Sequence, residues 1–195
     1  MRTTDPSGRC PQQVVTDSSV LVCSLDASFR EALEADSTVY LRYYRRVDAV
    51  FLSSIKDLLG AIRTGYDIVH LFSPLGPGGL LTDSGNATLV GTELIQKCCE
   101  RDVKLLWIAN DNMSDDYVEG FRPKDGSLSL NLVMTLSRNG PRFDGFLDKL
   151  LSRISGGETL PVAWVALAPQ AEGPWQQDLP GCMFFAGRAG VKLLS

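Results

Sequence analysis

Short apolar runs along this chain alternate with stretches whose apolar residues recur every three or four positions. The runs at residues 19–25, 67–72 and 103–109 are bounded by polar residues and predict buried strands. Residues 38–44 alternate more openly and predict an edge or half-covered strand. Two further strands are expected, at residues 128–136 and within residues 182–194, the last interrupted at Gly187 or Gly190.

Stretches with helical periodicity lie between these runs. Residues 55–62 place their apolar side chains on one helical face, and Ser54 stands at the capping position before them. Thr92 is expected to cap a second helix with a narrow apolar stripe. Residues 143–154 form the most regular pattern, and a shorter helix is expected to begin near Thr159.

Strands alternating with helices of this length predict an α/β protein with three layers, a mostly parallel central sheet covered by helices on both faces. We expect one domain over residues 18–195. Residues 1–17 lack periodicity and are interpreted as a flexible tail. Residues 75–91 are rich in glycine and polar residues and are expected to lack regular structure over much of their length.

Composition and charge narrow the possible functions. The net charge of −4 disfavours broad nucleic-acid binding, which needs clustered Lys and Arg. No apolar run is long enough to span a bilayer and the amino terminus has no apolar signal segment, so we expect no membrane association and a cytoplasmic location. The five cysteines have no CxxC spacing, so they predict neither a disulfide framework nor a zinc site. Four of them are interpreted as small buried hydrophobes, Cys23, Cys98, Cys99 and Cys182.

Two motifs from the middle of the chain carry a resemblance to a known family. A helix leads into the strand D-I-V-H-L-F at residues 67–72, which is followed by Leu75 and Gly76, and the later strand ends in W-I-A-N at residues 107–110. From about residue 55 to the carboxyl terminus, this order of motifs resembles the CHAT domains. These are caspase-like modules often found beside tetratricopeptide repeats in bacteria.

The resemblance implies a caspase-like fold in which the catalytic positions are replaced. Leu75 stands where the family has its catalytic histidine, and Asn110 stands where it has its cysteine nucleophile. A carboxamide cannot form the thiolate that cysteine peptidases need. The leading hypothesis is therefore a catalytically inactive domain that acts as a protein-interaction or regulatory module, with a protein partner, in a bacterial signalling or defence system.

Several side chains on the expected active face remain candidates for chemistry. His70, Ser73 and Asp111 lie at or beyond the ends of two predicted strands. Histidine is a frequent base, metal ligand or switch, yet a histidine packed inside the sheet is the preferred interpretation of His70. An alternative hypothesis is an active hydrolase with a non-standard nucleophile, for which Ser73, Cys98 and Cys99 are candidates.

A second alternative is a nucleotide-sensing domain that uses the glycine-rich loop at residues 76–91. Its backbone N–H groups and the helix expected at Thr92 could approach a phosphate. The run matches neither GxxxxGK[ST] nor GxGxxG, so an ordinary surface loop is the preferred interpretation.

The remaining polar clusters have plain structural explanations. Asn110, Asp111, Asp115 and Asp116 could form a weak divalent-cation site, but they are also typical of helix starts and turns. We therefore expect neither a metal nor a cofactor. The compact basic cluster Arg42, Arg45 and Arg46 is either an interaction edge for an acidic partner or a solvated strand edge, and the second interpretation is preferred.

Overall fold

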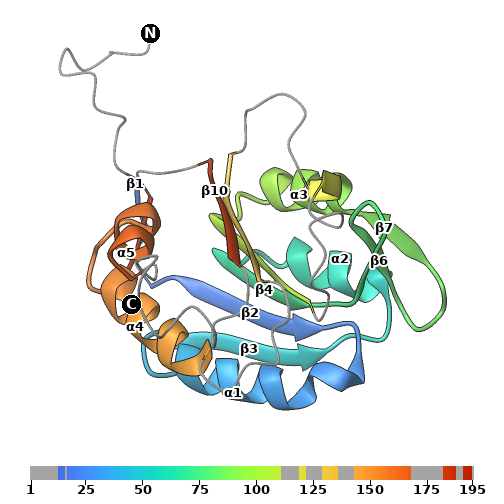
Figure 1. The fold of residues 1–195 in the computed structure, drawn as a ribbon, viewed down its shortest axis with the longest axis horizontal. Helices are drawn as coiled ribbons and strands as arrows, with labels where there is room; N and C mark the ends of the chain where they lie inside the picture. The colour runs from blue at the N-terminus through green and yellow to red at the C-terminus, as the bar shows by residue number, and fades with distance from the viewer. Residues whose placement is uncertain are drawn as a thin grey trace, which may run out of the picture.

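A six-stranded sheet forms the centre of the protein (Figure 1). The computed structural model describes residues 13–15, 17–110, 119–121, 129–135, 143–167, 182–187 and 191–194. The strand order is β10-β9-β8-β4-β2-β3, and every neighbouring pair is parallel except β9 and β10. The strands are β2 (Ser19–Ser24), β3 (Arg46–Phe51), β4 (Ile68–Phe72), β8 (Leu105–Ala109), β9 (Asn131–Thr135) and β10 (Cys182–Ala186). The predicted α/β class is confirmed.

Helices cover both faces of this sheet, which gives the predicted three layers (Figure 1). One face carries α1 (Arg30–Tyr40), α4 (Phe143–Ser155) and α5 (Leu160–Leu167), and the other carries α2 (Ile55–Arg63) and α3 (Gly91–Glu100). Side chains alternate along β4, so Val69 and Leu71 pack under α2 and α3, while Ile68 and Phe72 pack under α1 and α4. The described residues also include two short 3-10 helices, η1 (Ala27–Phe29) and η3 (Glu119–Phe121).

The strand predicted at residues 38–44 is wrong, because α1 extends to Tyr40. Burial along α1 follows a helical repeat, with Leu33, Ser37 and Tyr40 all buried against the sheet. The second strand of the sheet is β3, which follows this segment. The side chains of β3 are exposed or half-buried, so its sequence lacks the apolar run by which a buried strand is recognised.

The capping residue predicted for α2 is confirmed, and the one predicted for α3 is wrong. At α2 the prediction is confirmed, since the Ser54 hydroxyl accepts a hydrogen bond of 3.1 Å from the Asp57 N–H. Thr92, by contrast, does not cap α3. That helix begins one residue earlier, at Gly91, and the N–H of Gly91 donates to the Gly79 carbonyl at 3.2 Å. A backbone contact from outside the helix thus takes the place of the expected side-chain cap.

The expectation that residues 75–91 lack regular structure over much of their length is confirmed only for residues 77–79 and 83–87. Three short strands form an antiparallel sheet in this segment, β5 (Leu75–Gly76), β6 (Leu80–Thr82) and β7 (Thr88–Val90). Gly78 and Gly79 both have φ of +71°, a backbone conformation that glycine adopts without steric cost, and they turn the chain between β5 and β6. Leu81 and Leu89 are buried, so this small sheet is anchored to the core that includes α2 and α3.

The chain also pairs two segments near its ends. β1 (Gln13–Val15) lies parallel to β11 (Val191–Leu193), so the flexible-tail prediction is wrong for residues 13–15, while residues 1–12 lie outside the described residues. The predicted interruption of the last strand is confirmed, because β10 and β11 are separate and belong to different sheets. β1 forms a strand because it pairs with the distant β11, and its own sequence has no pattern that predicts a strand.

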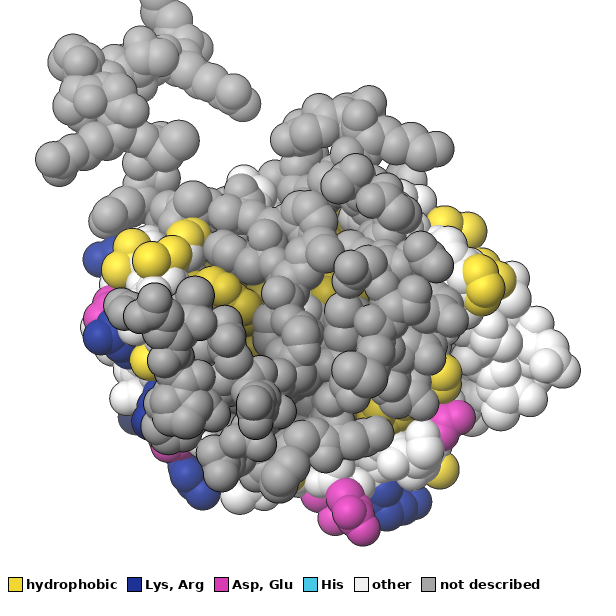
Figure 2. All heavy atoms as spheres, in the orientation of Figure 1, with side chains coloured by type: hydrophobic (Ala, Val, Ile, Leu, Met, Phe, Trp, Pro, Cys, Tyr) yellow, Lys and Arg dark blue, Asp and Glu magenta, His cyan; other side chains and the backbone are white. Residues whose placement is uncertain are grey.

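The apolar helix α5 is only partly covered by the rest of the chain. Leu160 and Ala163 are buried, whereas Val162 and Val165 are exposed, and Figure 2 shows apolar side chains gathered at this end of the protein. Within the described ranges no helix combines the length and hydrophobicity that crossing a lipid bilayer requires.

Candidate functional site

The candidate site lies where β4 and β8 end side by side. These strands are parallel neighbours with Phe72 opposite Ala109, so Ser73 and Asn110 follow them at the same edge of the sheet. The Ser73 N–H donates to the Ala109 carbonyl at 3.0 Å, and the Asn110 N–H donates to the Thr135 carbonyl at 3.1 Å. Both side chains are fully buried. Asp111, the third residue predicted for this face, lies outside the described residues, as do Asp115 and Asp116.

Ser73 makes a local hydrogen bond that occupies its hydroxyl. The O–H donates to the carbonyl oxygen of Pro74, the next residue, at 2.9 Å. A serine nucleophile needs a general base to accept this proton and needs access to the substrate carbonyl. In this conformation the proton goes to the backbone and the side chain has no solvent exposure, so Ser73 has the geometry of a turn residue.

Leu75 belongs to the hydrophobic core. It lies on β5 opposite Leu81, is 3% exposed, and packs in the cluster that also contains Leu89. The position at which the sequence resemblance expects a catalytic histidine is therefore a structural one. Its side chain has no group that can exchange a proton, and its surroundings are apolar.

His70 is enclosed by aromatic rings on the α1 side of the sheet. Its imidazole stacks on Phe72 with 4.7 Å between ring centroids and on Trp107 with 5.2 Å. The ring of Tyr40 meets it edge-on at 5.7 Å. Nε2 lies 3.7 Å from Oδ2 of Asp36, and both side chains are fully buried. The interpretation of His70 as a histidine packed inside the sheet agrees with this geometry.

Sequence reasoning missed Asp36, the carboxylate partner of His70. The residue lies on α1, where the sequence patterns predict no helix. The strand predicted at residues 38–44 overlaps the last turn of α1. A usable signal is present, since Phe29, Leu33 and Tyr40 recur at helical spacing and Asp36 falls on the same apolar stripe. A carboxylate on the buried face of a helix needs a polar partner inside the protein.

The thiols of Cys23 and Cys98 are buried and are not activated as nucleophiles. Burial raises the pKa of the Cys98 thiol to about 12, with a smaller effect from the neighbouring Cys99. Burial also raises the pKa of Cys23 far above its ordinary value, with a further contribution from Cys98. Both thiols therefore stay protonated near neutral pH, and their predicted role as small buried hydrophobes is confirmed. Cys99 is half-buried on α3.

The start of α3, where the nucleotide alternative expected a phosphate, is already in contact with other parts of the chain. Gly91 donates its N–H to Gly79, and a Cβ placed on Gly91 would lie only 2.6 to 2.7 Å from three ring carbons of Phe121. Phe121, from η3, is fully buried in this position. Within the described ranges no group of three or more His, Cys, Asp or Glu residues is placed to hold a metal ion.

The basic cluster of the sequence is divided between two places. Arg42 forms an ion pair of 3.1 Å with Asp148 on α4, and the hydroxyl of Tyr43 donates to the same carboxylate at 2.9 Å. These contacts attach the end of α1 to α4. Arg45 and Arg46 lie instead at the start of β3, where both are exposed.

No protein-family model matches the chain, and no curated protein matches it in sequence. The functional interpretation therefore depends on the residues themselves and on where the fold places them.

Proposed function

We propose that this chain is a CHAT-like, caspase-like domain without a catalytic dyad, which acts as a protein-interaction or regulatory module in a bacterial signalling or defence system. The observation that carries the proposal is the chemistry at two positions, Leu75 and Asn110. The resemblance assigns these positions to the histidine and the cysteine of a peptidase. Both are buried, and neither side chain can perform the corresponding step.

The arrangement of β4 and β8 supports this assignment of positions. The two strands are parallel neighbours, so residues that follow them lie at the same sheet edge, as partners in a catalytic dyad must. The two strands that carry the resemblance are present as β4 and β8, while the positions assigned to the dyad hold a leucine and an asparagine. A domain that keeps its scaffold in this way acts through its surfaces.

Among the described residues, neither Ser73 nor Cys98 replaces the missing dyad. The Ser73 hydroxyl donates to the Pro74 carbonyl, and the Cys98 thiol has its pKa raised to about 12 by burial. A substitute nucleophile would need a lowered pKa or an adjacent base, together with access to a substrate. Ser73 and Cys98 are both buried, the Ser73 proton is donated to a backbone carbonyl instead of a base, and the pKa of Cys98 is raised instead of lowered.

Activity-based labelling tests the proposal directly. The purified protein is treated with a fluorophosphonate and with an iodoacetamide probe, natively and after unfolding in guanidinium chloride, and is assayed on a mixture of fluorogenic peptides. We expect no peptide turnover, no fluorophosphonate label on Ser73, and labelling of Cys23 and Cys98 only after unfolding. Turnover that Ser73→Ala or Cys99→Ala abolishes, without loss of folded protein, would overturn the proposal.

A further inference from the structure

The strand β3 lies at one of the two edges of the central sheet. It is the last strand in the order β10-β9-β8-β4-β2-β3, and among the strands that the structure describes it pairs only with β2. Four of its six side chains are exposed, including Val50, which is 36% exposed. An edge strand of this length presents a row of backbone N–H and C=O groups to which another extended chain can bind.

The register of β3 identifies which of its backbone groups face outward. The N–H of Leu52, directly after the strand, donates to the Ser24 carbonyl on β2 at 2.9 Å. Backbone groups alternate in direction along a strand, so those of every second residue counted back from Leu52 face β2. The backbone groups of the intervening residues then point away from the sheet. These outward residues are Val47, Ala49 and Phe51.

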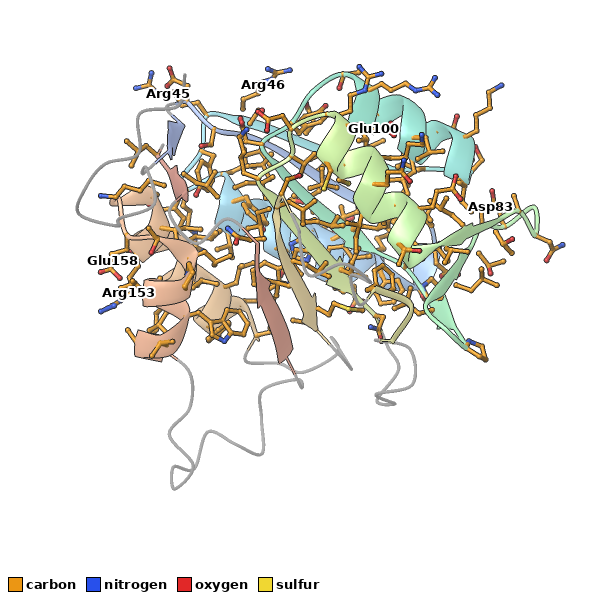
Figure 3. The ribbon with its side chains drawn as sticks, turned by 90° about the horizontal axis from the view of Figure 1, so that it is seen from above. Arg45, Arg46, Asp83, Glu100, Arg153 and Glu158 are labelled. Atoms are coloured by element: carbon orange, nitrogen blue, oxygen red, sulfur yellow. The ribbon has the colours of Figure 1, made fainter. Side chains whose placement is uncertain are left out.

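Positive charge lies along the same edge. Within the described part of the chain, neither Arg45 nor Arg46 has a carboxylate at ion-pair distance, and Figure 3 shows both at the rim of the protein. The guanidinium of Arg46 lies 5.6 Å from the centre of the Tyr66 ring. The nearby carboxylate of Asp48 accepts a hydrogen bond of 2.8 Å from the Tyr66 hydroxyl.

A third arginine lies near the other end of the strand. The guanidinium of Arg30 lies 4.6 Å from the centre of the Phe51 ring. Its distance to the exposed carboxylate of Glu34 is 4.0 Å, a weak surface contact. Arginines therefore flank both ends of β3, and they match carboxylate side chains in charge and in hydrogen-bonding geometry.

We propose that the edge of β3 is a docking strand for an extended, acidic segment of another protein. The segment adds to the sheet as a further strand, its backbone bonds to Val47, Ala49 and Phe51, and its carboxylates pair with Arg45 and Arg46. This inference rests on the proposed function, because it names the surface through which an interaction module would act. The two arginines give selectivity, since they repel basic segments.

Selection from a peptide library tests the proposal and requires no named partner. Randomised peptides of about ten residues, the length of a long strand, are displayed on phage and selected on the full chain. We expect the enriched peptides to alternate apolar and acidic residues. One enriched peptide is then synthesised with a fluorescent label, and its binding is measured by anisotropy at low and high salt, with weaker binding expected at high salt.

Two variants separate backbone pairing from charge. Ala49→Pro removes an outward N–H while leaving the hydrogen bonds to β2 intact, so we expect a folded protein whose affinity falls by about tenfold or more. Reversing both charges, with Arg45→Glu and Arg46→Glu together, is expected to weaken binding by about tenfold or more. Reversing two exposed charges on α2, with Lys56→Glu and Arg63→Glu together, changes the net charge equally; this matched control keeps the wild-type affinity.

Hydrogen exchange on the wild-type protein keeps the test independent of how the variants fold. Bound peptide should slow exchange of the Val47, Ala49 and Phe51 amides. Enriched peptides that lack acidic residues, that bind Ala49→Pro unchanged, or that leave these amides unprotected would overturn the docking surface. A wild-type dimer that Ala49→Pro converts to a monomer would also overturn it, because a second copy would then occupy the edge. The proposed function would be overturned by peptide turnover, which none of these results involves. Failure of the docking surface can therefore be distinguished from failure of the proposed function.

Discussion

His70 on β4 and Asp36 on α1 form a pair in the interior of the protein, with 3.7 Å between Nε2 and Oδ2 and no solvent exposure of either side chain. The imidazole also stacks on the rings of Phe72 and Trp107. The pair joins α1 to β4 through a polar contact, on the side of the sheet where the apolar and aromatic side chains around Phe72 and Trp107 are packed. Its role is therefore to fix α1 on the sheet.

Replacing His70 with alanine should destabilise the fold. His70→Ala empties a space between two rings and leaves the Asp36 carboxylate buried beside it, so we expect a loss of about 2 to 5 kcal/mol in the free energy of unfolding. Urea denaturation followed by tryptophan fluorescence measures this change. Asp36→Asn, which keeps the side-chain shape, should cost less. A His70→Ala protein of wild-type stability that has lost an activity would indicate a chemical role instead.

Gly91 should not tolerate a side chain, because a Cβ there would lie 2.6 to 2.7 Å from carbons of the Phe121 ring. We expect Gly91→Ala to destabilise the protein by about 1 to 3 kcal/mol, the usual cost of overpacking. Thermal unfolding by circular dichroism measures the shift. Gly60→Ala on α2 is the matched control. Nothing lies within 4 Å of a Cβ placed on Gly60, and alanine favours a helix, so this variant should gain about 0.5 to 1 kcal/mol.

Local patterns in the sequence are sufficient for elements whose burial repeats along a single segment. The spacing of apolar residues and the cap at Ser54 predict α2, and an uninterrupted apolar run predicts β8. Residues 38–44 mislead because aromatic and β-branched residues alternate there, while the real determinant is contact of Leu33 and Tyr40 with the sheet. β3 escapes prediction for the converse reason, since an exposed edge strand has no apolar run.

The candidate site is predictable in position but not in its contacts. That Ser73 and Asn110 follow neighbouring strands can be expected from the order of motifs. The pairing of His70 with Asp36 cannot, because it depends on α1 crossing the sheet. The contact of Phe121 with Gly91 likewise joins segments that are distant in sequence, and backbone approach of this kind leaves no periodic signal.

Leu75 should behave as a core residue. Leu75→Ala is expected to cost about 2 to 5 kcal/mol, and Leu75→His a similar or larger amount, because an imidazole at this position enters an apolar cluster. Chemical denaturation of both variants measures these losses. Leu41→Ala is the control, since Leu41 is 60% exposed and its replacement should change stability by less than about 0.5 kcal/mol. A Leu75→His protein as stable as wild type would show that the site still accommodates a histidine.

Asp83 should make the stability of the protein depend on pH in the acid range. The carboxylate joins the turn between β6 and β7 to the start of α2, since it accepts hydrogen bonds from the N–H groups of Ile55 at 3.0 Å and of Gly85 and Ala87 at 2.9 Å. These bonds hold the pKa of Asp83 below its ordinary value, and that from Ile55 has the largest effect. The stabilising contribution is therefore complete above the pKa of the unfolded chain, about 3.9, and is lost as the pH falls through the lower pKa of the folded state.

Substitution by asparagine isolates this contribution of Asp83. Asp83→Asn should be less stable than the wild type at about pH 6, and the difference should shrink as the pH falls below about 3.9, because the wild-type carboxyl then becomes neutral too. Urea denaturation of both proteins across this range measures the difference. A difference in the free energy of unfolding that stayed constant down to the most acidic folded condition would contradict this prediction. The hydrogen bonds to Ile55, Gly85 and Ala87 would then not depend on the charge of Asp83.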